Sequence, residues 1–264
     1  FGNSIHLKTK EFTIRNLLLF RKNSLCDSLL LKESERLIRS QRYIREVVVT
    51  PIFLGSTSDS IDIKVRVLDS WTLIPTGSLS SSKSSIKLTE RNIFGLGHQI
   101  SGEIGNQFSP SEKAIFGNYT INNVLNTFIR FDLEYSNDFD NDSKRKVSLN
   151  RPFYSVFTKN AGGLSFENTM FTEQFPVSDS LVYVPTKFEF QEYWYGRAFK
   201  ITSKSNPERY FTNMILALTY NQKVFGRLPE PTLDPSNYFS NEKNWIGMIG
   251  VSRQKFYQDT FVFN

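Results

Sequence analysis

The sequence predicts a small α+β domain followed by a larger domain of antiparallel strands, for which a transmembrane β-barrel is favoured over a soluble β-sandwich. Residues 1–75 change from helical spacing of apolar residues to a two-residue alternation, and from residue 84 onward only the alternation recurs. Aromatic residues, which favour strands, make up 14% of the chain. The mean hydropathy is −0.34, and the absence of any run of 18 apolar residues excludes membrane-spanning helices but not barrel strands.

Two amphipathic helices are expected near the start of the chain. Apolar residues between Lys10 and Phe20 recur close to helical spacing. Asp27 is a candidate N-cap for a second helix, whose apolar residues continue through Ile38. The residues expected in the core of this domain are Leu17, Leu18, Leu30, Leu37, Ile63 and Val65.

Two strands should follow the helices. Val47, Val48 and Val49 belong to a β-branched run that Pro51 interrupts, which indicates an edge strand. After a turn at 55–59, apolar and charged residues alternate over 61–67, as in a half-buried strand. The Ser-rich stretch 76–83 is interpreted as a linker or turn, so the predicted domains are 1–75 and 76–264.

About nine strands are predicted in the second domain, near 84–92, 98–107, 113–122, 126–136, 145–154, 162–169, 186–199, 209–224 and 244–257. Many are close to the length of a tilted membrane strand. One alternating set, Ile129, Phe131, Leu133 and Tyr135, is expected to face outward. Counting nine strands places the long breaks at 137–144, 171–185 and 226–243 at the same end as the N-terminal domain, although barrel turns at that end are usually short.

A barrel and a sandwich would both produce this alternation. Aromatic residues crowd the ends of some predicted strands, as at Tyr193, Trp194 and Tyr195, and Asn, Gly and Ser are abundant on the polar face. Both features favour a barrel, whose apolar face meets lipid, over a sandwich, whose polar face meets bulk water.

No enzyme chemistry is indicated. The chain has one cysteine and only two histidines, His6 and His98, so it cannot supply a His-rich or multi-cysteine metal site. No Gly-x-Ser-x-Gly elbow or phosphate-binding loop is found. The net charge of +6 is scattered rather than gathered in a basic block, so no nucleic-acid partner is expected. We therefore expect no catalytic residues, no metal and no cofactor.

The N-terminal residues resemble a known family. His6-x-x-Thr9, Thr13-Ile14-Arg15 and Leu18-Leu19-Phe20 are followed by Glu33-x-x-Arg36-Leu37-Ile38-Arg39 and Tyr43-Ile44. This pattern resembles a POTRA domain, the periplasmic module of the BamA/TamA-type outer-membrane assembly superfamily. POTRA domains run strand, helix, helix, strand, strand, so the resemblance implies that the first strand is missing or truncated.

Two further motifs extend this resemblance toward the barrel. Asp69-x-Trp71-Thr72-Leu73-x-Pro75 resembles the exit of the last POTRA domain, and Glu90-x-Asn92-Ile93-Phe94-Gly95-Leu96-Gly97-His98 resembles the first barrel hairpin. Gly95 and Gly97 allow positive φ in a tight hairpin, which Asn92 can start. Family barrels have sixteen strands, so the resemblance implies that this chain covers only the N-terminal part of one.

The resemblance implies a non-enzymatic outer-membrane protein, with its N-terminal domain in the periplasm, that assembles, inserts or translocates polypeptides by strand templating. Its partners would be outer-membrane lipid and client polypeptides or complex subunits. Val47, Val48 and Val49 would lie at a partner-binding edge of the N-terminal domain. The first barrel strand and its hairpin would form a lateral gate that includes Ile86, Leu88, Glu90, Asn92, Gly95 and Gly97. The alternatives are an anchor subunit of a larger complex and the barrel of a patatin-like fusion whose enzyme domain lies outside this chain.

Overall fold

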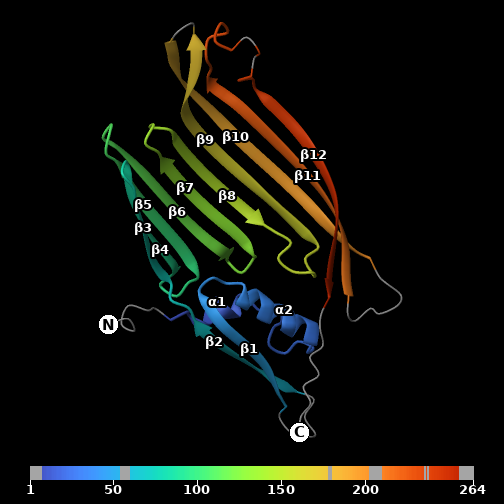
Figure 1. Cartoon of the computed structure of the whole chain (residues 1–264). Helices are drawn as coiled ribbons and strands as arrows, with labels where there is room; N and C mark the ends of the chain where they lie inside the picture. The colour runs from blue at the N-terminus through green and yellow to red at the C-terminus, as the bar shows by residue number, and fades with distance from the viewer. Residues whose placement is uncertain are drawn as a thin grey trace.

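The computed structural model describes residues 8–53, 60–177, 180–201, 210–234, 236 and 238–255. An N-terminal unit of two helices and a two-stranded sheet lies against one end of a ten-stranded antiparallel sheet (Figure 1). Within the described ranges, no helix combines the length and the apolar character that crossing a membrane requires. The predicted turn at 55–59 lies outside the described residues.

The N-terminal unit has the predicted order of two helices and two strands. Its elements are α1 (Glu11–Arg15), α2 (Ser28–Arg39), β1 (Ile44–Phe53) and β2 (Ile61–Asp69). β1 pairs only with β2 among the described residues. The core cluster consists of Ile14, Leu17, Ile38, Tyr43, Ile44 and Val47, with Leu18, Val49 and Val65 packed at its margin. Leu37 is also buried, whereas Leu30 and Ile63 are only half-buried.

One of the two helices begins where the sequence predicts, and the other is shorter than predicted. The side chain of Asp27 accepts a hydrogen bond from the Leu29 amide at 2.8 Å, which confirms the predicted N-cap of α2. α1 spans only five residues, so the helix expected to continue to Phe20 is wrong. The Leu19 amide donates to Ser34 Oγ on α2 at 2.9 Å instead of continuing the helical ladder. A tertiary hydrogen bond therefore replaces the local one.

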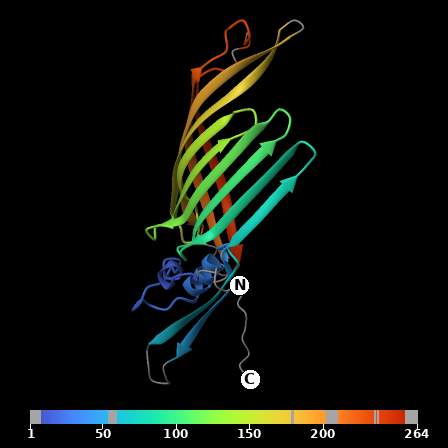
Figure 2. The same ribbon diagram turned by 90° about the vertical axis from the view of Figure 1, so that its left-hand side faces the viewer.

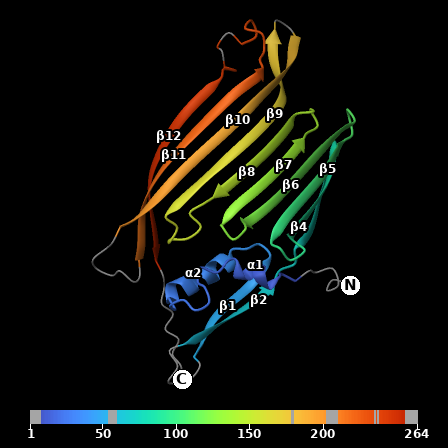
Figure 3. The same cartoon turned by 180° about the vertical axis from the view of Figure 1, so that it is seen from behind.

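Each strand of the large sheet pairs with its neighbours in sequence, so the sheet is a simple meander. Its strands are β3 (Leu73–Leu79), β4 (Lys83–Ile93), β5 (His98–Gln107), β6 (Glu112–Val124), β7 (Ile129–Asn137), β8 (Ser143–Arg151), β9 (Asn160–Val177), β10 (Ser180–Ile201), β11 (Tyr210–Arg227) and β12 (Glu242–Lys255). β3 and β12 do not pair, so the sheet is not closed. Figures 2 and 3 show the N-terminal unit below one end of all these strands.

The interpretation of residues 76–83 as a linker is wrong, because β3 runs through the start of this stretch and pairs with β4. The serine-rich sequence can form a strand here because the pairing with β4 is made by backbone groups and does not require apolar side chains. The hydroxyl groups of Ser78 and Ser85 also form a hydrogen bond across the pair at 2.9 Å.

The break predicted at 171–185 is also wrong, because β9 and β10 continue through it as a long hairpin. β8 pairs with β9 only as far as Met170, and β11 pairs with β10 only from Lys187 onward. Pro176 and Pro185 therefore lie where the ribbon is two-stranded, and a missing N–H on a free edge is tolerated there.

The additional strand β3 also changes which end of the sheet carries which connection. The connections β4–β5, β6–β7 and β8–β9 contact the N-terminal unit. The connections after β7, β9 and β11 consequently lie at the opposite, distal end (Figure 1). The sequence-based assignment of the long breaks to the proximal end was wrong by one strand.

The sheet has one apolar face and one polar face. The apolar face carries Ile86, Ile104, Ile115, Leu133 and Leu218, which are 74%, 63%, 50%, 46% and 50% exposed. The polar face carries Ser101, Thr120, Ser165 and Thr186, all of which are buried, together with ion pairs such as Lys144–Glu134 at 3.0 Å. In the described part of the chain no second sheet covers the apolar face, so the sandwich alternative is wrong.

Candidate functional site

The predicted gate strand is not at the edge of the sheet. Ile86, Leu88, Glu90 and Asn92 all lie on β4, which pairs with β3 on one side and β5 on the other. The edge is therefore β3, and β4 is the second strand. Sequence reasoning missed β3 because its residues lack an alternating apolar pattern.

The unpaired backbone groups of β3 can be assigned from its pairing with β4. The Arg91 amide donates to the Thr72 carbonyl at 3.1 Å, and the Ser80 amide donates to the Lys83 carbonyl at 2.8 Å. Because residues of an antiparallel pair alternate between bonded and non-bonded positions, the even-numbered residues from 72 to 80 face β4. The odd-numbered residues Leu73, Pro75, Gly77 and Leu79 therefore direct their backbone groups to the free edge.

The proximal half of this edge is partly blocked by its own sequence. Pro75 has no amide hydrogen to offer a new strand. The indole nitrogen of Trp71 donates to the Leu73 carbonyl, so that acceptor already has a partner. Pro75 separates the Leu73 amide from the two consecutive donors of the distal half, the amides of Gly77 and Leu79. The Leu79 side chain is 82% exposed. The part of β3 that can accept a strand is its distal half.

The hairpin between β4 and β5 is held by Asn92, whose side chain is 1% exposed. Asn92 Oδ1 accepts from the Gly97 amide at 2.7 Å, which closes the turn. Asn92 Nδ2 donates to Thr9 Oγ1 at 2.9 Å, which ties the turn to the N-terminal unit. Asn92 therefore closes the predicted hairpin and also anchors it across the domain junction.

Gly95 and Gly97 are required by conformation and by close approach. Their φ angles are +74° and +71°, as the sequence predicted for a tight hairpin. A Cβ on Gly95 would lie 2.3 Å from the Lys8 carbonyl oxygen, and one on Gly97 would lie 2.7 Å from the Tyr43 hydroxyl. The Gly95 carbonyl accepts from the Lys10 amide at 3.0 Å and from Thr13 Oγ1 at 2.8 Å. The start of α1 thus docks directly on the hairpin.

Thr9, Tyr43 and Asp69 also belong to this junction, although the sequence analysis did not predict it. Asp69 accepts from the amide and the hydroxyl of Thr9 at 2.8 and 2.9 Å. The Tyr43 side chain is almost fully buried, and its pKa is raised by burial and by the nearby Asp69 carboxylate. Thr9 and Asp69 are 60 residues apart in the sequence, so no local sequence pattern indicates this contact.

Two more connections rest on the N-terminal unit. Asn123 Nδ2 at the end of β6 donates to the Asn16 carbonyl at 2.9 Å. Phe128 in the next turn packs against the core cluster and stacks on Tyr154 with ring centroids 3.9 Å apart. Tyr154 belongs to the loop between β8 and β9, so neighbouring proximal connections also contact each other.

Arg36 on α2 makes the third contact, donating to the Tyr154 carbonyl at 2.6 Å. The same guanidinium forms a two-pronged ion pair with Glu33, with both nitrogen–oxygen distances at 2.8 Å. The Glu33 side chain is fully buried, and its hydrogen bonds raise the pKa of Arg36. A buried carboxylate needs such a partner, so Arg36 supports α2 and the junction together.

The predicted partner-binding residues Val47, Val48 and Val49 lie together on β1 but face differently. Val47 is 1% exposed and belongs to the core, whereas Val48 is 44% exposed. Val49 packs at the margin of the core. In the described part of the chain β1 has a strand on one side only, so its other backbone edge remains unpaired. Among these side chains, only that of Val48 is well exposed.

The described residues contain no group of three or more His, Cys, Asp or Glu side chains placed to bind a metal ion. His98 shares a hydrogen bond of 2.8 Å with the Tyr119 hydroxyl, and its ring meets Tyr119 edge-on. The chemistry that the arrangement offers is backbone hydrogen bonding at the β3 edge, next to a hairpin held rigidly by the N-terminal unit.

Comparison with solved structures finds chains of similar fold. No protein-family model and no curated protein sequence matches this chain. The chain is similar to the crystal structure of BamA from Haemophilus ducreyi lacking POTRA domains 1–3, with 12% identity and a TM-score of 0.47. The match covers 86% of this chain and 54% of that one, so this chain spans about half the length of its relative.

Proposed function

We propose that this chain is part of an outer-membrane β-barrel protein of the BamA/TamA type, which assembles or inserts polypeptides by pairing a client strand with its sheet edge. The N-terminal unit would be a POTRA-like domain on the periplasmic side. The proposal has no chemical step and needs no cofactor. Its partners would be membrane lipid and client polypeptides.

The observation that carries the proposal is the inverted distribution of polarity across the sheet. Isoleucines and leucines on the apolar face, such as Ile86, Ile104 and Leu218, are half or more exposed, whereas Ser101, Thr120, Ser165 and Thr186 on the polar face are buried. A soluble sheet buries its apolar face, and an uncovered face of this size would promote aggregation in water. In a bilayer the same face meets lipid, and the polar face lines the lumen.

The N-terminal unit supports an assignment of sides. It hydrogen-bonds to residues at one end of the sheet, and the longest connection between strands, 228–241, lies at the other end (Figure 1). Membrane barrels have short periplasmic turns and longer extracellular loops. With the N-terminal unit in the periplasm, the connection at 228–241 would be extracellular. The free β1 edge would then face periplasmic proteins and could pair with one of them.

The β3 edge supports templating. Backbone groups without partners cost several kcal/mol each in hydrocarbon, so an edge at membrane depth gains free energy by pairing with another strand. In the proximal half of β3, Pro75 lacks an N–H and Trp71 occupies the Leu73 carbonyl, so the two consecutive free donors are the amides of Gly77 and Leu79. A client would therefore start pairing at the distal half of β3.

Replacement of Gly77 tests the proposal. Gly77→Pro removes the N–H that faces the free edge, and the bonds between β3 and β4 remain. Gly77→Ala is the matched control, because a Cβ there meets only the Ser85 carbonyl oxygen at an ordinary 3.5 Å. With the full chain reconstituted in liposomes, Gly77→Pro should slow insertion of an unfolded barrel client about tenfold, roughly the effect of one lost hydrogen bond, whereas Gly77→Ala should insert normally.

The two parts of the proposal fail in different ways. Wild-type insertion rates in Gly77→Pro would overturn templating at β3 and leave a membrane anchor as the function. Failure of the wild-type chain to float with liposomes, or its extraction by alkaline carbonate, would overturn the membrane assignment itself.

A further inference from the structure

Two neighbouring glycines leave a notch in the apolar face of the sheet. Gly102 on β5 and Gly117 on β6 are directly opposite each other, and a Cβ on either would meet nothing within 4 Å. Two glycines on the polar face differ, because aromatic rings cover them. A Cβ on Gly105 would lie 2.9 Å from the Phe139 ring, and one on Gly196 would lie 3.1 Å from the Phe153 ring. The chain fills those two positions and leaves this one open.

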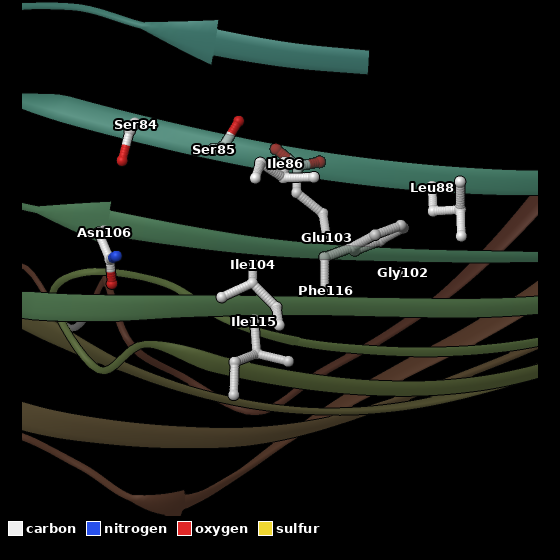
Figure 4. A pocket seen from close by; sticks show the side chains of 10 residues that line it. All are labelled: Ser84, Ser85, Ile86, Leu88, Gly102, Glu103, Ile104, Asn106, Ile115 and Phe116. Atoms are coloured by element: carbon white, nitrogen blue, oxygen red, sulfur yellow. The ribbon is translucent and has the colours of Figure 1, made fainter. Parts of the chain in front are cut away.

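Gly102 of this notch lines a groove of about 590 Å³ (Figure 4), and Gly117 is its neighbour on β6. The apolar walls of the groove are formed by Ile86, Leu88, Ile104 and Ile115, which are all at least half exposed. Leu88, Gly102 and Gly117 form one row across three strands, and the three isoleucines form the next row toward the distal end. No residue of these two rows is charged. Glu103 also lines the groove, and its carboxylate pairs with Lys87 at 3.6 Å.

The distal end of the groove is polar, and a lysine lies beside it. Ser84 and Asn106 line it there, and Lys113 is the cross-strand partner of Asn106. Lys113 is exposed and lies two residues before Ile115 on β6, on the same face and nearer the distal end. Arg145 is also exposed on the apolar face, with its guanidinium over the Tyr135 ring at 5.9 Å. A cation thus stands at the end of an apolar channel, where a headgroup would emerge.

We propose that this groove binds one acyl chain of an anionic phospholipid, with the chain over Gly102 and Gly117 and the phosphate near Lys113. This order of groups from notch to rim matches the order along a lipid, from hydrocarbon tail to charged head. A protein side chain could fill the notch but would leave the isoleucine row and the lysine without a matched partner. The inference depends on the proposed membrane location of the apolar face.

Lipid retention measured by native mass spectrometry tests the site. The full chain would be purified in detergent and titrated with phosphatidylglycerol or phosphatidylcholine. Gly102→Val fills the notch, and the matched control Gly247→Val adds the same side chain to the apolar face of β12, where a Cβ also meets nothing within 4 Å. Both substitutions suit a strand, so both variants should fold.

The wild-type chain and Gly247→Val should each retain one phosphatidylglycerol. Gly102→Val should bind it about tenfold more weakly, the equivalent of two lost methylene contacts. Lys113→Gln should lower the preference for phosphatidylglycerol over phosphatidylcholine about fivefold, the effect of one basic residue at a lipid surface.

Equal retention by Gly102→Val and the wild-type chain would overturn the site. Unchanged headgroup preference in Lys113→Gln would overturn the phosphate contact. Liposome flotation of the same variants separates these outcomes from failure of the proposed function. If all variants float but retention does not depend on Gly102, only the lipid site is wrong; if none floats, the membrane location is wrong.

Discussion

Gly97 of the β4–β5 hairpin lies directly against the buried hydroxyl of Tyr43, so close that a Cβ at this glycine would lie 2.7 Å from the Tyr43 oxygen. The hairpin of the large sheet and the core of the N-terminal unit therefore share one packed contact. The stability of the junction should depend on glycine at this position.

Gly97→Ala should destabilise the junction by about 2–4 kcal/mol, because it combines a positive φ with a steric clash against a core side chain. Urea unfolding of the detergent-solubilised chain would measure the loss. Gly102→Ala is the control, since its Cβ meets open space, and it should change stability little. If Tyr43→Phe in the Gly97→Ala background restores nothing, the clash is not with the hydroxyl.

Asn92→Ala should cost about 2–3 kcal/mol, because it leaves the buried Gly97 amide without its acceptor and removes the hydrogen bond that Asn92 donates to Thr9. Limited proteolysis should also cleave more rapidly near residue 10, where the N-terminal unit meets the hairpin. The comparison variant is Asn118→Ala, whose half-buried side chain makes longer hydrogen bonds, 3.3 Å to the Leu133 carbonyl and 3.1 Å from Thr120 Oγ1. Equal effects of the two substitutions would contradict the special role of Asn92.

Arg36→Met should destabilise the N-terminal unit by about 3–5 kcal/mol, because the fully buried Glu33 carboxylate loses its ion partner. The double variant Glu33→Gln/Arg36→Met should recover part of this loss, since a neutral amide is less costly to bury than a lone charge. Thermal unfolding of the two variants provides the comparison. A double variant as unstable as Arg36→Met would mean that the Tyr154 contact, rather than the buried charge, dominates.

Leu37→Ala should cost about 2–5 kcal/mol, because Leu37 is 5% exposed in the packed face of α2. Leu25→Ala removes the same atoms from a side chain that is 94% exposed and should have almost no effect. Denaturant titration of the full chain would compare them. Similar losses at both positions would contradict the observed burial.

Much of the local structure could be predicted from the sequence. The N-cap at Asp27, the alternating strand at 61–67 and the positive φ of Gly95 and Gly97 all depend on residues within a few positions of one another. The same holds for the outward exposure of Leu133 and Tyr135, which are 46% and 41% exposed. These features can be recognised in the sequence because they depend on local backbone preference and on the alternation of residues along a strand.

The errors share a different origin. α1 ends early because Leu19 donates to Ser34 on another helix. β3 was missed because it is held by backbone pairing with β4 and has no alternating apolar residues. Without β3, the sequence analysis placed every later connection at the wrong end of the sheet. The break predicted at 171–185 is instead a continuous hairpin, whose two strands pair with each other beyond the ends of β8 and β11.

The sequence by itself determined the order of the two helices and two strands of the N-terminal unit, the alternation that gives the sheet its two faces, and the glycine hairpin, because each is encoded by neighbouring residues. Only the tertiary structure decided that β3 forms the sheet edge, that Asn92 and Tyr43 join hairpin to N-terminal unit, and that Gly102 faces Gly117 across an open groove. These features depend on strand register and on contacts tens of residues apart, and the chain acquires them only when its long-range pairs form.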